Sequence, residues 1–253
     1  MRHFFTLLSH ELRMLLVNPG TYIAATAFLV FMGFIFTGIL ESYSKAPQET
    51  SPAHVYFQFF WLPVFFMVPL LTMKCLAEER RLGTIETLLT TPVTTTEVVV
   101  GKYAAAYCLY LGLWASTAGF FWILHKFAGD ARFLDLGPLL GGYLFISVSG
   151  LLFVAVGVFA SSLSRNQAVA GILCFTMLFA LIIGVRFVED AQWLDRAAFQ
   201  PVKAAVDYAQ IFTHYADFTR GVVDTRHLLF YFSGTVLALI FSILGVEAKL
   251  LHS

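Results

Sequence analysis

The segment TYIAATAFLVFMGFIFTGIL, residues Thr21–Leu40, runs for twenty residues without a charged side chain. A helix needs about 20 apolar residues to cross the hydrocarbon core of a bilayer, so this segment predicts a transmembrane span. Five further segments meet the same criterion: Val55–Met73, Tyr103–Leu124, Leu136–Leu163, Ala168–Val185 and Leu228–Val246. The sequence therefore predicts an all-α integral membrane protein with six transmembrane helices.

The composition of the whole chain agrees with this class. Of the 253 residues, 58% are hydrophobic and 13% are charged, whereas an average soluble domain is about 25% charged. The net charge is zero, which gives no indication of nucleic acid or of an acidic substrate as partner. We expect residues 1–253 to form a single transmembrane domain in contact with the lipid bilayer.

The second span carries two prolines, Pro63 and Pro69. Proline inside a span is tolerated where neighbouring helices satisfy the freed carbonyl groups. We therefore expect this helix to be kinked and packed within the bundle.

The first residues, 1–19, have the periodicity of an amphipathic helix. Polar side chains recur on one face at Arg2, Thr6, Ser9 and Arg13, and the other face is apolar, with Phe5, Leu8, Leu12, Leu15 and Leu16. Such a helix lies in the membrane interface. The sequence Asn18-Pro19-Gly20 predicts the turn that ends it.

The basic residues predict the orientation. In the first half of the chain, one side of the membrane would carry Arg2, Arg13, Lys74, Arg80, Arg81 and Lys102, and the other side Lys45, Lys126 and Arg132. Because cytoplasmic loops are enriched in Lys and Arg, we expect both termini and the connection between the second and third spans to be cytoplasmic.

The sequence lacks the residues that several classes of membrane and metal-dependent proteins require. No Asp, Glu, Lys or Arg lies deep in a predicted span, although ion-coupled transporters need such groups as relays. His10 opens a pattern like HExxH, but Met14 stands where the second histidine is required, and no phosphate-binding GxxxxGK[ST] motif occurs. The three cysteines form no metal-binding spacing. The sequence thus predicts no catalytic residue, metal site or cofactor in this chain.

The charged residues cluster in one segment, KCLAEERRLGTIETLLTTPVTTTEVVVGK, from Lys74 to Lys102. Its first part reads as a helix that continues from the second span, and Pro92 breaks it. Thr94 and Glu97 have the spacing of a capping box, which predicts the start of the next helix. The resulting helical hairpin would present carboxylates to a soluble partner; alternatively, its charges only solvate a loop.

The same segment resembles the cytoplasmic segment of type-2 ABC transporter permeases. The family pattern is matched at twelve positions: Glu78, Glu79, Arg80, Gly83, Thr84, Glu86, Leu88, Leu89, Pro92, Val93, Gly101 and Lys102. The resemblance extends more weakly over the whole chain, in the interfacial helix, the six spans and the long connection before the last span. Within the family, the chain is most similar to gliding-motility-associated permeases.

This resemblance implies that residues 74–102 form a coupling helix that docks on a separate ATPase. Glu78, Glu79 and Arg80 would lie at the contact, Gly83 and Thr84 at a close helix approach, and Glu86 would reach the ATPase. The implied assembly contains two ATPase subunits, which hold ATP and Mg, and a second permease subunit as homodimer or heterodimer. A periplasmic accessory protein and a location in the bacterial inner membrane are also implied.

The connection between the last two spans, residues 186–227, mixes aromatic and acidic side chains. This mixture favours short amphipathic helices at the outer interface, and the resemblance implies that they gate the exit; the alternative is a packed aromatic cap. Asp224 or Thr225 is the expected N-cap of the final span.

The function expected from this resemblance is that of the membrane subunit of an ATP-driven exporter, within a gliding-motility or secretion system. A non-transporting membrane scaffold that recruits a soluble partner is the alternative. An intramembrane enzyme is disfavoured, because the serines of the fourth span, Ser147, Ser149, Ser161 and Ser162, have no matched base. The sequence does not indicate the cargo.

Overall fold

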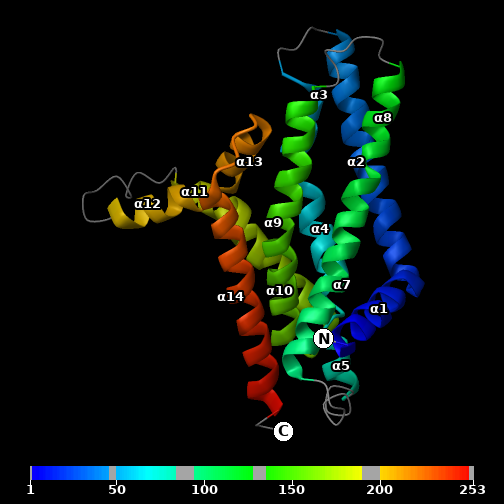
Figure 1. Cartoon of the computed structure of the whole chain (residues 1–253), viewed down its shortest axis with the longest axis vertical. Coiled ribbons are helices and arrows are strands. Elements are labelled where there is room, and N and C mark those ends of the chain that lie inside the picture. Colours follow the sequence, from blue (N-terminus) through cyan, green and yellow to red (C-terminus); the bar gives the residue numbers. More distant parts are fainter. Residues whose placement is uncertain (1, 46–49, 84–93, 128–134, 190–199, 251–253) are drawn as a thin grey trace.

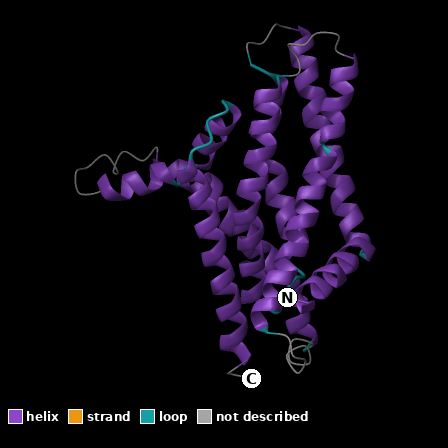
Figure 2. Ribbon diagram, viewed as in Figure 1, coloured by secondary structure: helices purple, strands orange, loops and turns teal. Residues whose placement is uncertain are grey.

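The computed structural model describes residues 2–45, 50–83, 94–127, 135–189 and 200–250, and this part of the chain is helical, without strands (Figure 1, Figure 2). The helices are α1 (Arg2–Val17), α2 (Pro19–Lys45), α3 (Pro52–Gln58), α4 (Trp61–Thr72), α5 (Ala77–Leu82), α7 (Thr95–Ser116), α8 (Ala118–Phe127), α9 (Leu136–Leu163), α10 (Gln167–Phe179), α11 (Val185–Glu189), α12 (Gln200–Tyr208), α13 (Ile211–Thr219) and α14 (Thr225–Leu250), with a π-helical turn at Ala180–Gly184 between α10 and α11.

Six helical segments of the described residues are long and apolar enough to cross a membrane, as the sequence predicts. They are Pro19–Lys45, Trp61–Leu82, Thr95–Phe127, Leu136–Leu163, Gln167–Val188 and Thr225–Ala248. The predicted bounds of the fourth span are those observed. The ends of the other spans differ from the prediction by one to nine residues. Most of the observed helices extend beyond the predicted apolar stretch, whereas the second span begins six residues later than predicted, at Trp61.

The sequence predicts the second span as one kinked helix, but the structure divides it into two helices. The chain forms α3, then a short interruption at Phe59 and Phe60, and then α4. Pro63 explains the position of the break, because a proline ring clashes with the carbonyl group four residues earlier, which here is that of Phe59. Pro69 lies inside α4 without ending it. The helix also ends earlier than expected, at Thr72, and four residues in turns precede α5.

Helix α9 is the centre of the bundle, and it packs against α14, α10, α13, α7 and α4 (Figure 1). Glycines permit these close contacts. A Cβ built on Gly150 would lie 2.3 Å from a ring carbon of Tyr110, and one built on Gly157 would lie 2.4 Å from Thr72 Oγ1. Side chains larger than hydrogen therefore do not fit on these faces of α9.

Helix α1 crosses the same end of the bundle as α5 and the last turns of α14 (Figure 1). Its chain reverses at Asn18, whose Oδ1 accepts the N–H of Gly20 at 3.0 Å, and Pro19 already opens α2, a position that proline favours. Leu7 of α1 packs on α7, because a Cβ on Gly101 would come within 2.9 Å of it.

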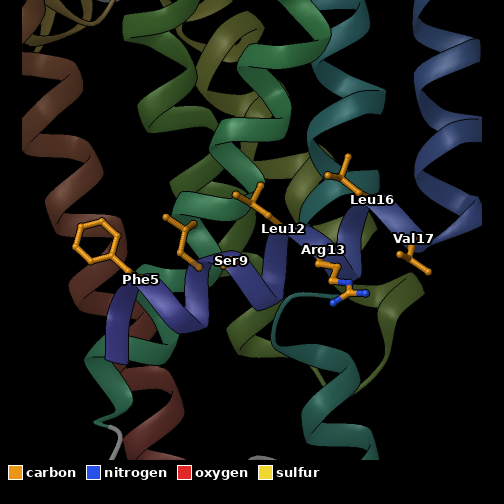
Figure 3. A pocket seen from close by; sticks show the side chains of 7 residues that line it. Phe5, Ser9, Leu12, Arg13, Leu16 and Val17 are labelled. Atoms are coloured by element: carbon orange, nitrogen blue, oxygen red, sulfur yellow. The ribbon is translucent and has the colours of Figure 1, made fainter. Parts of the chain in front are cut away.

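The predicted apolar face of α1 is only partly covered by the bundle, since Leu8, Leu12 and Leu15 are half-buried. Phe5 is 66% exposed and Leu16 is 49% exposed. Together with Leu12 they line a shallow hollow of about 490 Å³, in which Leu12 and Leu16 extend to one side of the helix and Arg13 to the other (Figure 3). An apolar face left open at the end of a membrane bundle is the arrangement expected of a helix in the lipid interface.

The connection before the last span forms the predicted short helices in its described part, and residues 190–199 lie outside that part. Helix α12 has no buried residue, whereas α13 buries Ile211, His214, Tyr215 and Phe218. Helix α13 contacts α9 and α3. Asp224 is the cap of the final span, since its Oδ1 accepts the N–H of Arg226 at 2.8 Å.

Candidate coupling site

Helix α5, with the sequence AEERRL, forms the first part of the charged segment. Acidic residues occupy its first turn and basic residues its last turn, which complements the helix dipole. It ends at Gly83, which has φ +70°. This left-handed conformation is typical of a glycine that terminates a helix, so the helix does not continue through the segment as predicted.

Three charged side chains from three helices meet beside α5. The ammonium group of Lys102 on α7 donates to Glu11 Oε1 of α1 at 2.7 Å, and it lies 2.7 Å from Glu79 Oε1 of α5. The Lys102 side chain is only 5% exposed, and those of Glu11 and Glu79 are 16% and 19% exposed. We call these residues the Lys102 cluster.

Charge and burial make the Lys102 cluster a strong link between its helices. One ammonium ion compensates two carboxylates, away from most of the solvent. Removal of one partner from a buried ion pair leaves an uncompensated charge, which costs several kcal/mol. The α5 segment therefore does not separate from α7 and α1 without breaking charge-assisted hydrogen bonds.

Helix α9 holds the other side of α5 through two serines. Ser161 Oγ accepts the N–H groups of Leu76 and Ala77 at 3.0 and 3.1 Å, which satisfies donors at the start of α5. Arg80 donates to the carbonyl oxygen of Ser162. Through these contacts α5 is joined to the central helix of the bundle as well as to the Lys102 cluster.

The segment returns to the membrane at α7 through the predicted capping box. The Glu97 N–H donates to Thr94 Oγ1 at 3.2 Å, and the Thr94 N–H donates to Glu97 Oε2 at 3.2 Å. This arrangement satisfies two donors at the start of the third span. Residues 84–93, between α5 and this cap, lie outside the described part of the chain.

The model of the family described as ABC-2 family transporter protein matches residues 6–246 of the sequence. The chain belongs to this ABC-2 transporter family. The match covers most of α1, the charged segment and nearly all of the six spans, so it agrees with the resemblance to type-2 ABC permeases. It supports a multi-pass membrane subunit of a transporter, and it does not single out a gliding-motility subfamily. Among curated proteins, none matches the chain.

The residues that the sequence singled out occupy different environments in this ABC-2 family protein. Glu78 is partly exposed and lies 3.9 Å from Arg81, whereas Glu79 faces the interior of the chain. Gly83 has no atom within 4 Å of a built Cβ, so its conformation, and not crowding inside this chain, requires glycine. Thr84 and Glu86 lie outside the described residues. Contact of these six positions with an ATPase stays a prediction.

The sequence alone does not indicate the partners of α5. It marks Lys102 as part of the family pattern and as a flanking charge, but it gives no role to Glu11, Ser161 or Ser162. One signal was available, since Glu11 follows Leu7 by four residues and thus shares its helix face. Pairing over 91 residues of sequence has no signature in a single chain, and the cluster was recognisable only from the packing.

Proposed function

We propose that this chain is the permease subunit of an ATP-driven exporter, and that α5 with the residues after it receives motion from a separate ABC ATPase. Membership of the ABC-2 transporter family, six apolar spans and one charged segment at one end of the bundle support this function. The family implies an ATPase partner on another chain, which would hold ATP and Mg. We assign no cargo.

The Lys102 cluster is the observation that carries the proposal. It connects α5, where a soluble partner would push, to α7, which spans the membrane, and to α1, which lies along the surface. Because both carboxylates share one ammonium ion, a displacement of α5 must move α7 and α1 or separate the charges. A contact that only solvated a loop would not bury a lysine in this way.

The finer features of the assembly belong to the same proposal. We place α5 and both ends of the chain in the cytoplasm and the chain in the bacterial inner membrane, because basic residues gather at the end where α1, α5 and the last turns of α14 lie (Figure 1). Two ATPase subunits and a second permease subunit, identical or related, would complete the transporter. Its use in a gliding-motility or secretion system, with a periplasmic accessory protein, is the context that the sequence resemblance suggests.

Two variants test whether the cluster transmits motion. Lys102→Met removes the charge link and destabilises the fold, whereas the triple variant Glu11→Gln, Glu79→Gln, Lys102→Met removes the link without leaving a buried charge. With the partner ATPase in proteoliposomes, we expect the triple variant to lose ATP-dependent flux by tenfold or more while ATP is still hydrolysed. Binding of the ATPase is measured separately, because Glu79 is also a predicted ATPase contact. Lys45→Gln, which changes an exposed lysine paired with Glu41, is the control.

Two outcomes would overturn the proposal. If the triple variant transports as well as the wild type, the cluster is structural only. If the wild type binds a soluble partner but ATP drives no flux of any substrate, the chain is a non-transporting scaffold and not an exporter subunit. The orientation has its own test: a cysteine introduced as Thr90→Cys, in a chain without native cysteines, should react with a membrane-impermeant reagent only from the cytoplasmic side.

A further inference from the structure

A second hollow lies where α1 turns into α2, beside the end of α4. Its volume is about 260 Å³, and it is lined by residues of α1, α2 and α4 and of the turn after α4. A cavity of about 10–15 Å³ already holds a water molecule. The hollow therefore has room for a much larger ligand, and we call it the α2–α4 groove.

The apolar end of the α2–α4 groove is open to the side of the bundle. Helix α2 contributes the small side chains of Ala24 and Ala27 to its lining, and α4 contributes Leu70 and Leu71. Ile23 and Leu70 are 71% and 46% exposed. Since α2 lies at the edge of the bundle (Figure 1), the groove faces the region that lipid chains fill around a membrane-spanning protein.

The polar end of the groove favours an anion. Lys74 is half-buried there and forms no ion pair with a described residue, in contrast to Lys45 and Lys102. Asn18 uses its Oδ1 for the N–H of Gly20, so its amide nitrogen is left to donate. The dipole of the 27-residue α2 adds positive potential at this end, although the N–H groups of Gly20 and Thr21 already bond to Asn18.

We propose that the α2–α4 groove binds an anionic glycerophospholipid, with one acyl chain along Ala24, Ala27 and Leu71 and the phosphate beside Lys74. The ligand must join an apolar chain to a negative group over the short distance between the two ends of the groove, and it must enter from the lipid-facing side. A phospholipid in the leaflet at this end of the bundle has this chemistry and this position. The site does not depend on coupling to an ATPase.

Native mass spectrometry of the purified full-length chain, with phosphatidylglycerol or phosphatidylcholine added at known concentrations, tests the site. We expect the wild type to bind the first phosphatidylglycerol more tightly than phosphatidylcholine. Lys74→Gln should weaken binding of phosphatidylglycerol about fivefold, the effect of one lysine at an anionic surface, and leave phosphatidylcholine unchanged. Lys74→Arg should keep the preference. Ala27→Phe, which fills the groove, should weaken binding of both lipids.

Arg81→Gln is the matched control, because it removes an exposed cation at the same end of the bundle without touching the groove, and it should leave both affinities unchanged. A melting temperature measured for each variant separates loss of the site from loss of the fold. The proposal is overturned if Lys74→Gln keeps the wild-type preference for phosphatidylglycerol, or if Ala27→Phe binds both lipids like the wild type. Competition by glycerol phosphate as strong as that by the lipid would equally contradict it, since the acyl chain would then contribute nothing.

Discussion

Lys102 and Glu11 are 91 residues apart in the sequence, and their ammonium and carboxylate groups meet at 2.7 Å inside the protein. The contact joins a surface helix to a spanning helix at the end of the bundle where α5 begins. Because Glu79 shares the same ammonium group, one lysine links the three helices α1, α5 and α7.

Lys102→Met should lower the free energy of unfolding by about 3 kcal/mol, because two carboxylates remain without their cation. Thermal unfolding in detergent, followed by tryptophan fluorescence, measures the change. The triple variant that also carries Glu11→Gln and Glu79→Gln should regain most of the loss. Arg81→Met, which breaks only the exposed pair with Glu78, should cost less than about 1 kcal/mol; an equal loss in both single variants would contradict a special role of Lys102.

Ser161→Ala should destabilise the junction between α9 and α5 by about 1–3 kcal/mol. The substitution removes the acceptor of the Leu76 and Ala77 N–H groups, and a buried donor without a partner costs about this much. Ser233→Ala is the comparison, since Ser233 is exposed and bonds only to Phe230 within its own helix. Hydrogen exchange at the start of α5 should increase in the Ser161 variant alone, and unchanged exchange there would argue against this serine as a cap.

Gly141→Ala should destabilise the contact between α9 and α13 more than an ordinary glycine substitution. The new Cβ would lie 2.1 Å from the carbonyl oxygen of Phe218, and a backbone atom cannot move aside as a side chain can. The melting temperature should fall by several degrees. At Gly38 a Cβ meets nothing within 4 Å, so Gly38→Ala should leave the melting temperature unchanged or raise it, because alanine favours helix.

The stability of the α13–α14 junction should depend on pH through His214. Burial, and next the charge of the His227 ring, lower the pKa of His214 to about 4, from an ordinary value of 6.5 in the unfolded chain. Between these values the unfolded chain binds a proton that the folded protein excludes, so the free energy of unfolding decreases as the pH falls from 6.5 to 4. The neutral ring contacts the Tyr231 hydroxyl and the Tyr208 carbonyl.

Unfolding measured at several pH values between 4 and 8 tests this dependence. His214→Gln should flatten the profile, while His10→Gln, on the exposed side of α1, should retain the wild-type slope. Part of the slope should persist in the His214 variant, because burial and the Arg220 charge also lower the pKa of His54. A wild-type slope in His214→Gln would show that another group is responsible.

The sequence predicts the six spans because the requirement for apolar length is local. Caps are predictable for the same reason, as Thr94 with Glu97 and Asp224 show. The break of the second span before Pro63 also follows from a local rule, because a proline clashes with the carbonyl group four residues earlier. The continuous apolar stretch Val55–Met73 nevertheless predicts a single helix.

The candidate site was predicted only in part. Its position in the chain follows from clustered charge and from the family pattern, but the direction of each side chain does not. In the structure Glu79 faces Lys102, and the start of α5 is bonded to Ser161 of the fourth span. Both contacts join α5 to helices that are distant in the sequence. Such long-range packing leaves no periodic pattern in a single sequence.

The glycine contacts of α9 limit how the bundle can rearrange. Rotation of α9 about its own axis would press the side chain of Tyr110 in α7 or Thr72 in α4 against the α9 backbone. These contacts therefore fix the orientation of α9 relative to α7 and α4. In an apolar stretch of 18 residues, 67% is buried in α9, against 22% in Gln167–Val188. A change between inward-open and outward-open states would then move the outer helices relative to α9. The ends of those helices are where we expect hinges, and the π-helical turn after α10 is one candidate.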